Sequence, residues 1–145
     1  MPANWYLGGG DILPGSFSDL VASYSNQTLS PPCMTGASSI TCGRPLTSLQ
    51  KGAMLVDVSH NSTLPGPVRP WPGTPTTVSG FQAWVTDEHG QQGACSGLGA
   101  DRTLSEIIPF PDAPNNYFAI DICSRGVPES VGTRILESLR VSASL

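Results

Sequence analysis

Residues 117–124 read Tyr-Phe-Ala-Ile-Asp-Ile-Cys-Ser, and this stretch decides the fold of the chain. Apolar side chains alternate along it with a period of two, which is typical of a β-strand with one buried face. Phe118, Ile120 and Ile122 share the face that we expect to lie on the core. Asp121 and Cys123 share the other face, which the pattern predicts to point outward.

Five segments before this stretch also carry strand patterns. The cleanest is residues 52–59, where Met54, Val56 and Val58 alternate with their neighbours and predict a half-buried strand. The others are residues 5–7, 17–24, 78–88 and 103–110. Of these, residues 78–88 read as the longest strand, and residues 17–24 allow a short helix as the alternative.

Prolines divide the strand-rich part of the chain. Five prolines lie within residues 61–77, and each removes a backbone donor and fixes φ, so we predict a loop there. Trp71, inside that loop, either packs on the domain or contacts a partner. A second break, at residues 112–116, is predicted to be a turn.

The C-terminal part has a different period. Val131, Ile135 and Leu139 recur every four residues after Pro128, so residues 128–140 are predicted to form a helix that packs on the sheet. At 145 residues the chain fits a single domain, 1–145, in which residues 1–16 form an edge strand and a turn. We therefore predict an α+β domain with an antiparallel sheet of about five to seven strands and one C-terminal helix.

Four cysteines, in a chain rich in turns, predict a disulfide framework with three possible pairings. We expect Cys33 to pair with Cys42 across a small loop, and Cys95 with Cys123, giving two disulfides. A zinc site is disfavoured because no close pair of cysteines is present. A nucleophilic Cys123 is disfavoured because no histidine with a catalytic signature accompanies it. Disulfides imply an oxidising compartment.

Composition excludes several function classes. The net charge is −4, and Lys51 with six arginines forms no basic stripe, so neither nucleic acid nor an anionic membrane surface is an expected partner. No stretch approaches the ~20 apolar residues of a membrane span. We expect no cofactor and no metal ion.

Few residues are candidates for chemistry. Asp87, Glu88 and His89 adjoin, but neighbours along a strand point to opposite faces, so we assign no catalytic residue and keep a hydrolase only as a third hypothesis. Trp71 and Phe110 lie among prolines in predicted loops, and we choose them as possible contacts with a ligand or partner.

The start at Trp5-Tyr6-Leu7, the strand-rich middle and the end at residues 135–141, Ile-Leu-Glu-Ser-Leu-Arg-Val, resemble small extracytoplasmic domains of GC-rich bacteria that end in a helix with an "SLRV" tail. Some of those domains look like the Mog1/PsbP-type α+β fold. The resemblance implies a non-enzymatic extracytoplasmic domain of a secreted or membrane-anchored bacterial protein that senses or binds another protein. The alternative is a module that binds a small molecule or a peptide, which would need a concave apolar pocket with a few polar groups.

Overall fold

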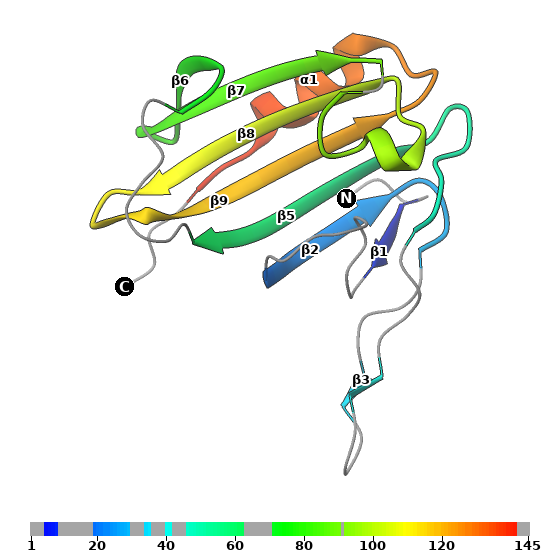
Figure 1. Cartoon of the computed structure of the whole chain (residues 1–145), viewed down its shortest axis with the longest axis horizontal. Helices are drawn as coiled ribbons and strands as arrows, with labels where there is room; N and C mark the ends of the chain where they lie inside the picture. Colours follow the sequence, from blue (N-terminus) through cyan, green and yellow to red (C-terminus); the bar gives the residue numbers. More distant parts are fainter. Residues whose placement is uncertain are drawn as a thin grey trace.

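The computed structural model describes residues 5–8, 19–29, 34–35, 40–41, 46–62, 71–90 and 92–141. They form a seven-stranded antiparallel sheet in the order β1-β2-β5-β9-β8-β7-β6, a separate two-stranded sheet and one α-helix (Figure 1). The strands of the large sheet are β1 (Tyr6–Gly8), β2 (Asp19–Ser25), β5 (Met54–Ser62), β6 (Thr74–Val78), β7 (Phe81–His89), β8 (Arg102–Phe110) and β9 (Ala113–Ser124). The small sheet pairs β3 (Met34–Thr35) with β4 (Ile40–Thr41), and the helices are the 3₁₀ turn η1 (Ser96–Leu98) and α1 (Glu129–Ser138). The predicted α+β class is confirmed.

The stretch that opened the sequence analysis is the middle of the sheet. β9 pairs with β5 from Asn116 to Ser124 and with β8 on its other side. Because β9 is 12 residues long, it is the longest strand described, and residues 113–116 belong to it where the sequence predicted a turn. The strand assigned the greatest length from sequence, residues 78–88, is instead β7 from Phe81 to His89.

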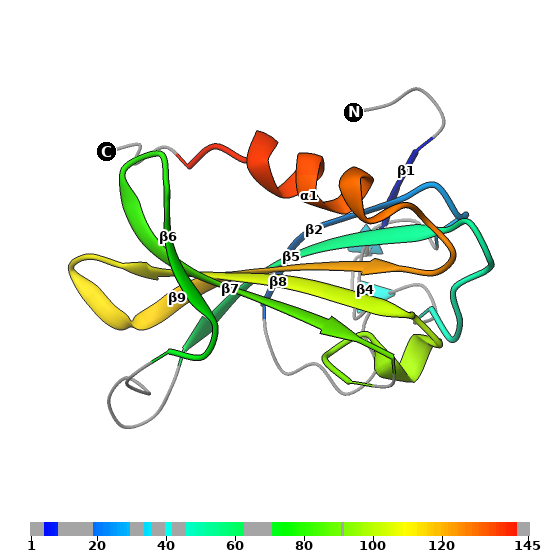
Figure 2. The same ribbon diagram turned by 90° about the horizontal axis from the view of Figure 1, so that it is seen from above.

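The side of the sheet covered by α1, here called the helix face, carries the larger apolar core. Figure 2 shows α1 lying along this side. The buried core residues come from β5, β6, β7, β8 and β9, and Val131 and Ile135 of α1 pack against them. Phe118, Ile120 and Ile122 lie on this face, as their alternation predicts. The predicted C-terminal helix is confirmed, but α1 runs from Glu129 to Ser138, within the predicted range 128–140, with Pro128 at its N-cap.

The opposite side of the sheet, here called the loop face, is buried as well. Figure 2 places the segment that holds η1 on this side. Leu98 of that segment packs with Leu55 and Cys123 in a second apolar cluster. Cys123 is therefore 0% exposed, and the prediction that it points outward was wrong. For the same reason β5 is buried on both faces, not half-buried.

Cys95 and Cys123 form a disulfide with a Cα–Cα distance of 5.5 Å, which confirms the predicted pairing. The bridge ties the segment before η1 to the central strand. The expected bridge between Cys33 and Cys42 lies outside the described residues, as do residues 9–16 of the predicted N-terminal turn.

The proline-rich segment is partly a strand. Residues 74–78 form β6, although the sequence predicted a loop over residues 61–77, and residues 61–62 are the end of β5. β6 is the last strand in the sheet order and pairs with β7 alone, so it can contain Pro75, which has no N–H to donate. A two-residue turn joins the two strands, with φ of 51° at Ser79 and 83° at Gly80, as hairpin turns of this length require.

Candidate functional site

A pocket of about 460 Å³ lies on the helix face, between the second half of α1 and strands β6 to β8. Val85 and Leu104 line it from the sheet, and Leu136 and Leu139 line it from the helix end. Its size falls in the range of roughly 300–1,000 Å³ that is common for small-molecule sites. We call it the helix–sheet pocket.

Glu106 is the unusual residue of this pocket. It lies in β8, where the pairing sets it beside Val85 of β7 and Ile120 of β9. The side chain is 2% exposed, and its Oε2 atom has no hydrogen-bond partner among the described residues. Burial raises the pKa of the Glu106 carboxyl. The described Lys, Arg and His side chains form no ion pair with it.

A buried arginine, Arg102, also lines the helix–sheet pocket. Arg102 donates from Nε to Asp87 Oδ1 at 2.8 Å and from Nη2 to Asp87 Oδ2 at 3.0 Å. This two-pronged pair lowers the pKa of Asp87 and raises that of Arg102. Nη1 of Arg102 also donates to the Glu129 carbonyl at 2.7 Å, which fixes the first turn of α1 to the sheet. Arg102 thus acts as a structural clamp.

The cluster considered for a hydrolase is divided between the two faces. His89 Nε2 lies 2.7 Å from Glu129 Oε1, on the helix side with Asp87. Glu88 of β7 lies opposite Thr103 of β8, and its side chain points to the loop face. The three residues therefore do not converge, and Asp87 and His89 instead connect the sheet to the start of α1.

The loop face carries a polar row across the middle of the sheet. Asp57 of β5 and Asp121 of β9 are directly opposite in the register. The Ser23 hydroxyl donates to Asp57, and the Ser105 hydroxyl donates to Asp121 Oδ1 at 2.5 Å. Burial, with the nearby charge of Glu88 adding to it, raises the pKa of Asp121, and the Ser105 bond opposes this change. Asp57 is buried and Asp121 is partly buried, and each carboxyl group accepts a hydrogen bond from a neighbouring strand.

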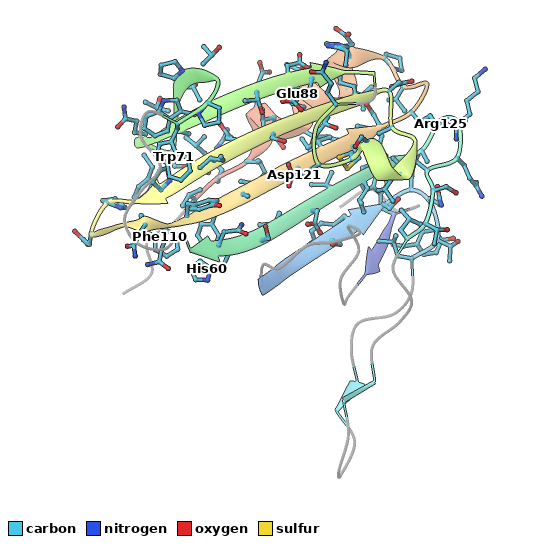
Figure 3. The ribbon with its side chains drawn as sticks, viewed as in Figure 1. His60, Trp71, Glu88, Phe110, Asp121 and Arg125 are labelled. Carbon is cyan, nitrogen blue, oxygen red and sulfur yellow. A yellow bond between two sulfur atoms is a disulfide. The ribbon has the colours of Figure 1, made fainter. Side chains whose placement is uncertain are left out.

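The two aromatic residues chosen from the sequence lie at the same end of the sheet, away from Arg125 (Figure 3). Trp71 is 6% exposed, and its ring contacts Tyr117 at a centroid distance of 4.9 Å. Phe110 stacks on His60 at 5.5 Å and contacts Phe118 at 5.0 Å. Trp71 therefore packs on the domain, as one of the two readings of the sequence expected.

Beyond the helix–sheet pocket, the helix face has a second, smaller concavity of about 280 Å³. We call it the apolar hollow, and its lining is Val58, Ile108, Phe118, Ile120, Leu139, Arg140 and Val141. Leu139 and Arg140 line both concavities, so the segment after α1 separates them. Val141 N donates to Ser79 Oγ at 2.9 Å and holds this segment against the β6–β7 turn.

Sequence patterns alone do not identify Glu106 as a site residue. The available signal was an acidic residue in an apolar position, because Leu104, Glu106 and Ile108 share one face of the predicted strand 103–110. From alternation alone, a polar residue in an apolar position only weakens the prediction of a strand and does not indicate a binding site.

No family model, curated protein or solved structure matches this chain. Within the described ranges, no helix has the length and apolar character needed to cross a membrane. No three His, Cys, Asp or Glu side chains of those ranges gather as they would around a metal ion.

Proposed function

We propose that this chain is a non-enzymatic module that binds a small molecule in the helix–sheet pocket, as part of an extracytoplasmic protein. The observation that carries the proposal is the buried Glu106 carboxyl at the pocket, with its Oε2 atom unpartnered among the described residues. The sequence favoured sensing or protein interaction, with small-molecule binding as the alternative, and this pocket favours the alternative.

An unpaired buried polar atom destabilises a folded protein by roughly 1–3 kcal/mol. Native structures contain few such atoms, and those present need a reason. A ligand that forms a hydrogen bond with Oε2 removes the deficit, and Val85, Leu104 and Leu136 offer apolar contacts to the rest of it. Binding and specificity then come from the same carboxyl group.

Two observations support the remaining parts of the proposal. Asp87 and His89, which a hydrolase would use, are held in contacts with Arg102 and Glu129. The buried Cys95–Cys123 bridge is of the kind found in oxidising compartments, which supports an extracytoplasmic location.

The test uses the fluorescent apolar probe 1-N-phenylnaphthylamine and two tryptophan variants of β6. Thr76 and Thr74 are both exposed on this strand, but only Thr76 lines the helix–sheet pocket. We expect saturable binding to the wild type, which Thr76→Trp weakens by about tenfold or more (about 1.4 kcal/mol) and Thr74→Trp leaves unchanged. Absence of saturable binding, or equal effects of the two variants, would overturn the proposal.

A further inference from the structure

We infer that the ligand of the helix–sheet pocket is a primary amine, bound as its ammonium ion at Glu106, with an apolar part that extends into the apolar hollow. This inference rests on the proposed function and names the chemical class of its ligand. Three features of the pocket lead to it: the charge balance, the position of Glu106 and the lining on either side of it.

The charge balance favours a cation. The other charged side chains that line the helix–sheet pocket are Asp87, Arg102, Glu137 and Arg140. Arg102 is matched by Asp87 at 2.8 Å, and Arg140 donates from Nη1 to the carbonyl oxygens of Glu137 and Leu139. Neither arginine forms an ion pair with Glu106, and the lining holds three acidic and two basic side chains, so its net charge is negative. A buried carboxylate is stable only when it is paired and hydrogen-bonded, and an ammonium ion supplies both charge and three donors.

The position of Glu106 fixes where the apolar part goes. On β8, Leu104 lines the helix–sheet pocket and Ile108 lines the apolar hollow, with Glu106 between them. Ile120 of β9, which lies opposite Glu106 in the strand register, also lines the apolar hollow. Two residues along a strand span about 7 Å, so a short carbon chain reaches from Oε2 into the hollow.

The segment after α1 lies over this path. Leu139 and Arg140 line both concavities, and Val141 is held to Ser79 at 2.9 Å. A ligand bound at Glu106 with its chain in the hollow would therefore contact residues 139–141. Its carbon chain would contact Ile108, Phe118 and Leu139, which supply apolar surface. Arg140, the cation in the lining of both concavities, already donates from Nη1 to two backbone carbonyls.

The experiment compares three probes of equal length, hexylamine, 1-hexanol and hexanoate, as competitors of 1-N-phenylnaphthylamine. In the wild type we expect hexylamine to bind about tenfold tighter than hexanol, or more, and hexanoate to bind most weakly. Glu106→Gln keeps the shape of the side chain and removes its charge. It should abolish the preference for the amine while leaving hexanol affinity within about threefold.

Glu137→Gln is the matched control, because Glu137 also lines the pocket but is exposed. It should change hexylamine affinity by less than about threefold. If it removes the amine preference as fully as Glu106→Gln does, the general negative charge of the pocket selects the amine, and the inference is wrong.

A wild-type measurement covers the case in which Glu106→Gln does not fold. Hexylamine affinity should rise as pH increases from acidic to neutral values, because the Glu106 carboxyl, whose pKa is raised by burial, ionises as pH rises, while hexanol affinity should not rise. Asp87 and Arg102 keep their charges over this range, since the pKa of the first is lowered and that of the second is raised. Equal trends for the two probes would contradict the inference.

The two proposals fail in different ways. If hexanol binds as tightly as hexylamine in the wild type, the pocket binds ligands but the amine class is wrong. If neither these probes nor 1-N-phenylnaphthylamine binds saturably, the proposed function itself is overturned.

Discussion

Asp57 and Glu106 are two carboxyl groups buried at the middle of one sheet, on opposite faces, with 3% and 2% of each residue exposed. Asp57 accepts a hydrogen bond from Ser23, whereas Oε2 of Glu106 lacks a partner among the described residues. Equal burial thus has different consequences. On the loop face the polar group joins neighbouring strands, and on the helix face it remains available to a molecule that enters the pocket.

The largest loss of stability is expected when the disulfide that anchors the segment over the loop face is removed. Replacing both Cys95 and Cys123 by Ala should lower the free energy of unfolding by about 3–4 kcal/mol, because the bridge closes a loop with a sequence separation of 28. Urea denaturation measures the change. Ser96→Ala, at an exposed neighbour of the bridge, is the control and should have an effect below about 0.5 kcal/mol. A double variant as stable as the wild type would contradict the role given to the bridge.

Asp57→Ala tests the satisfied carboxyl directly. We expect a loss of about 2–3 kcal/mol in the free energy of unfolding, because the Ser23 hydroxyl is left buried without its acceptor. Adding Ser23→Ala to this variant should cost little more, since both changes remove the same hydrogen bond. Fully additive losses in urea denaturation would argue that the two side chains act independently.

Glu106→Leu should have the opposite sign. Leucine has a similar size and needs no partner, so we expect the ligand-free protein to gain about 1 kcal/mol in the free energy of unfolding. Glu137→Leu, at an exposed position of the same pocket, should change it by less than about 0.5 kcal/mol. A loss above about 1 kcal/mol for Glu106→Leu would mean that Glu106 is already hydrogen-bonded in solution.

The smallest expected effect is on the pH dependence of stability. The pKa of Glu106 is raised on folding, so its contribution is fully present below the unfolded value of about 4.3 and is lost as pH rises through the folded value. In the Glu106→Gln variant, the free energy of unfolding should therefore fall less steeply as pH rises above about 4.3. Asp87 behaves in the reverse sense, since its lowered pKa makes its contribution disappear as pH falls. An unchanged profile from about pH 4 to pH 7 in the variant would contradict this account.

The sequence predicts the parts of this fold that repeat locally. Alternation identifies the central strand from Phe118, Ile120 and Ile122, and the four-residue period identifies α1. Strand β6 was not predicted, because proline is unfavourable in a strand. An edge strand, however, does not need the N–H that Pro75 lacks.

The site could not be predicted for a different reason. The burial of Glu106 depends on α1, which begins more than twenty residues later, and that of Cys123 depends on the segment around η1. Local periodicity identifies the two faces of a strand but not what covers them. Side chains brought together across strands, such as Asp57 and Asp121, lie far apart in the sequence.

The place of β9 in the chain has a consequence for synthesis. Of the nine strands that the described residues form, it comes last, yet it lies between β5 and β8. During synthesis on the ribosome, β5 and β8 are made before β9. Until residues 113–124 have emerged, the edges of β5 and β8 that pair with β9 leave backbone donors and acceptors open to other chains. The pairing of β5 with β9 joins residues more than fifty positions apart, and long-range pairing of this kind is typical of slow-folding topologies.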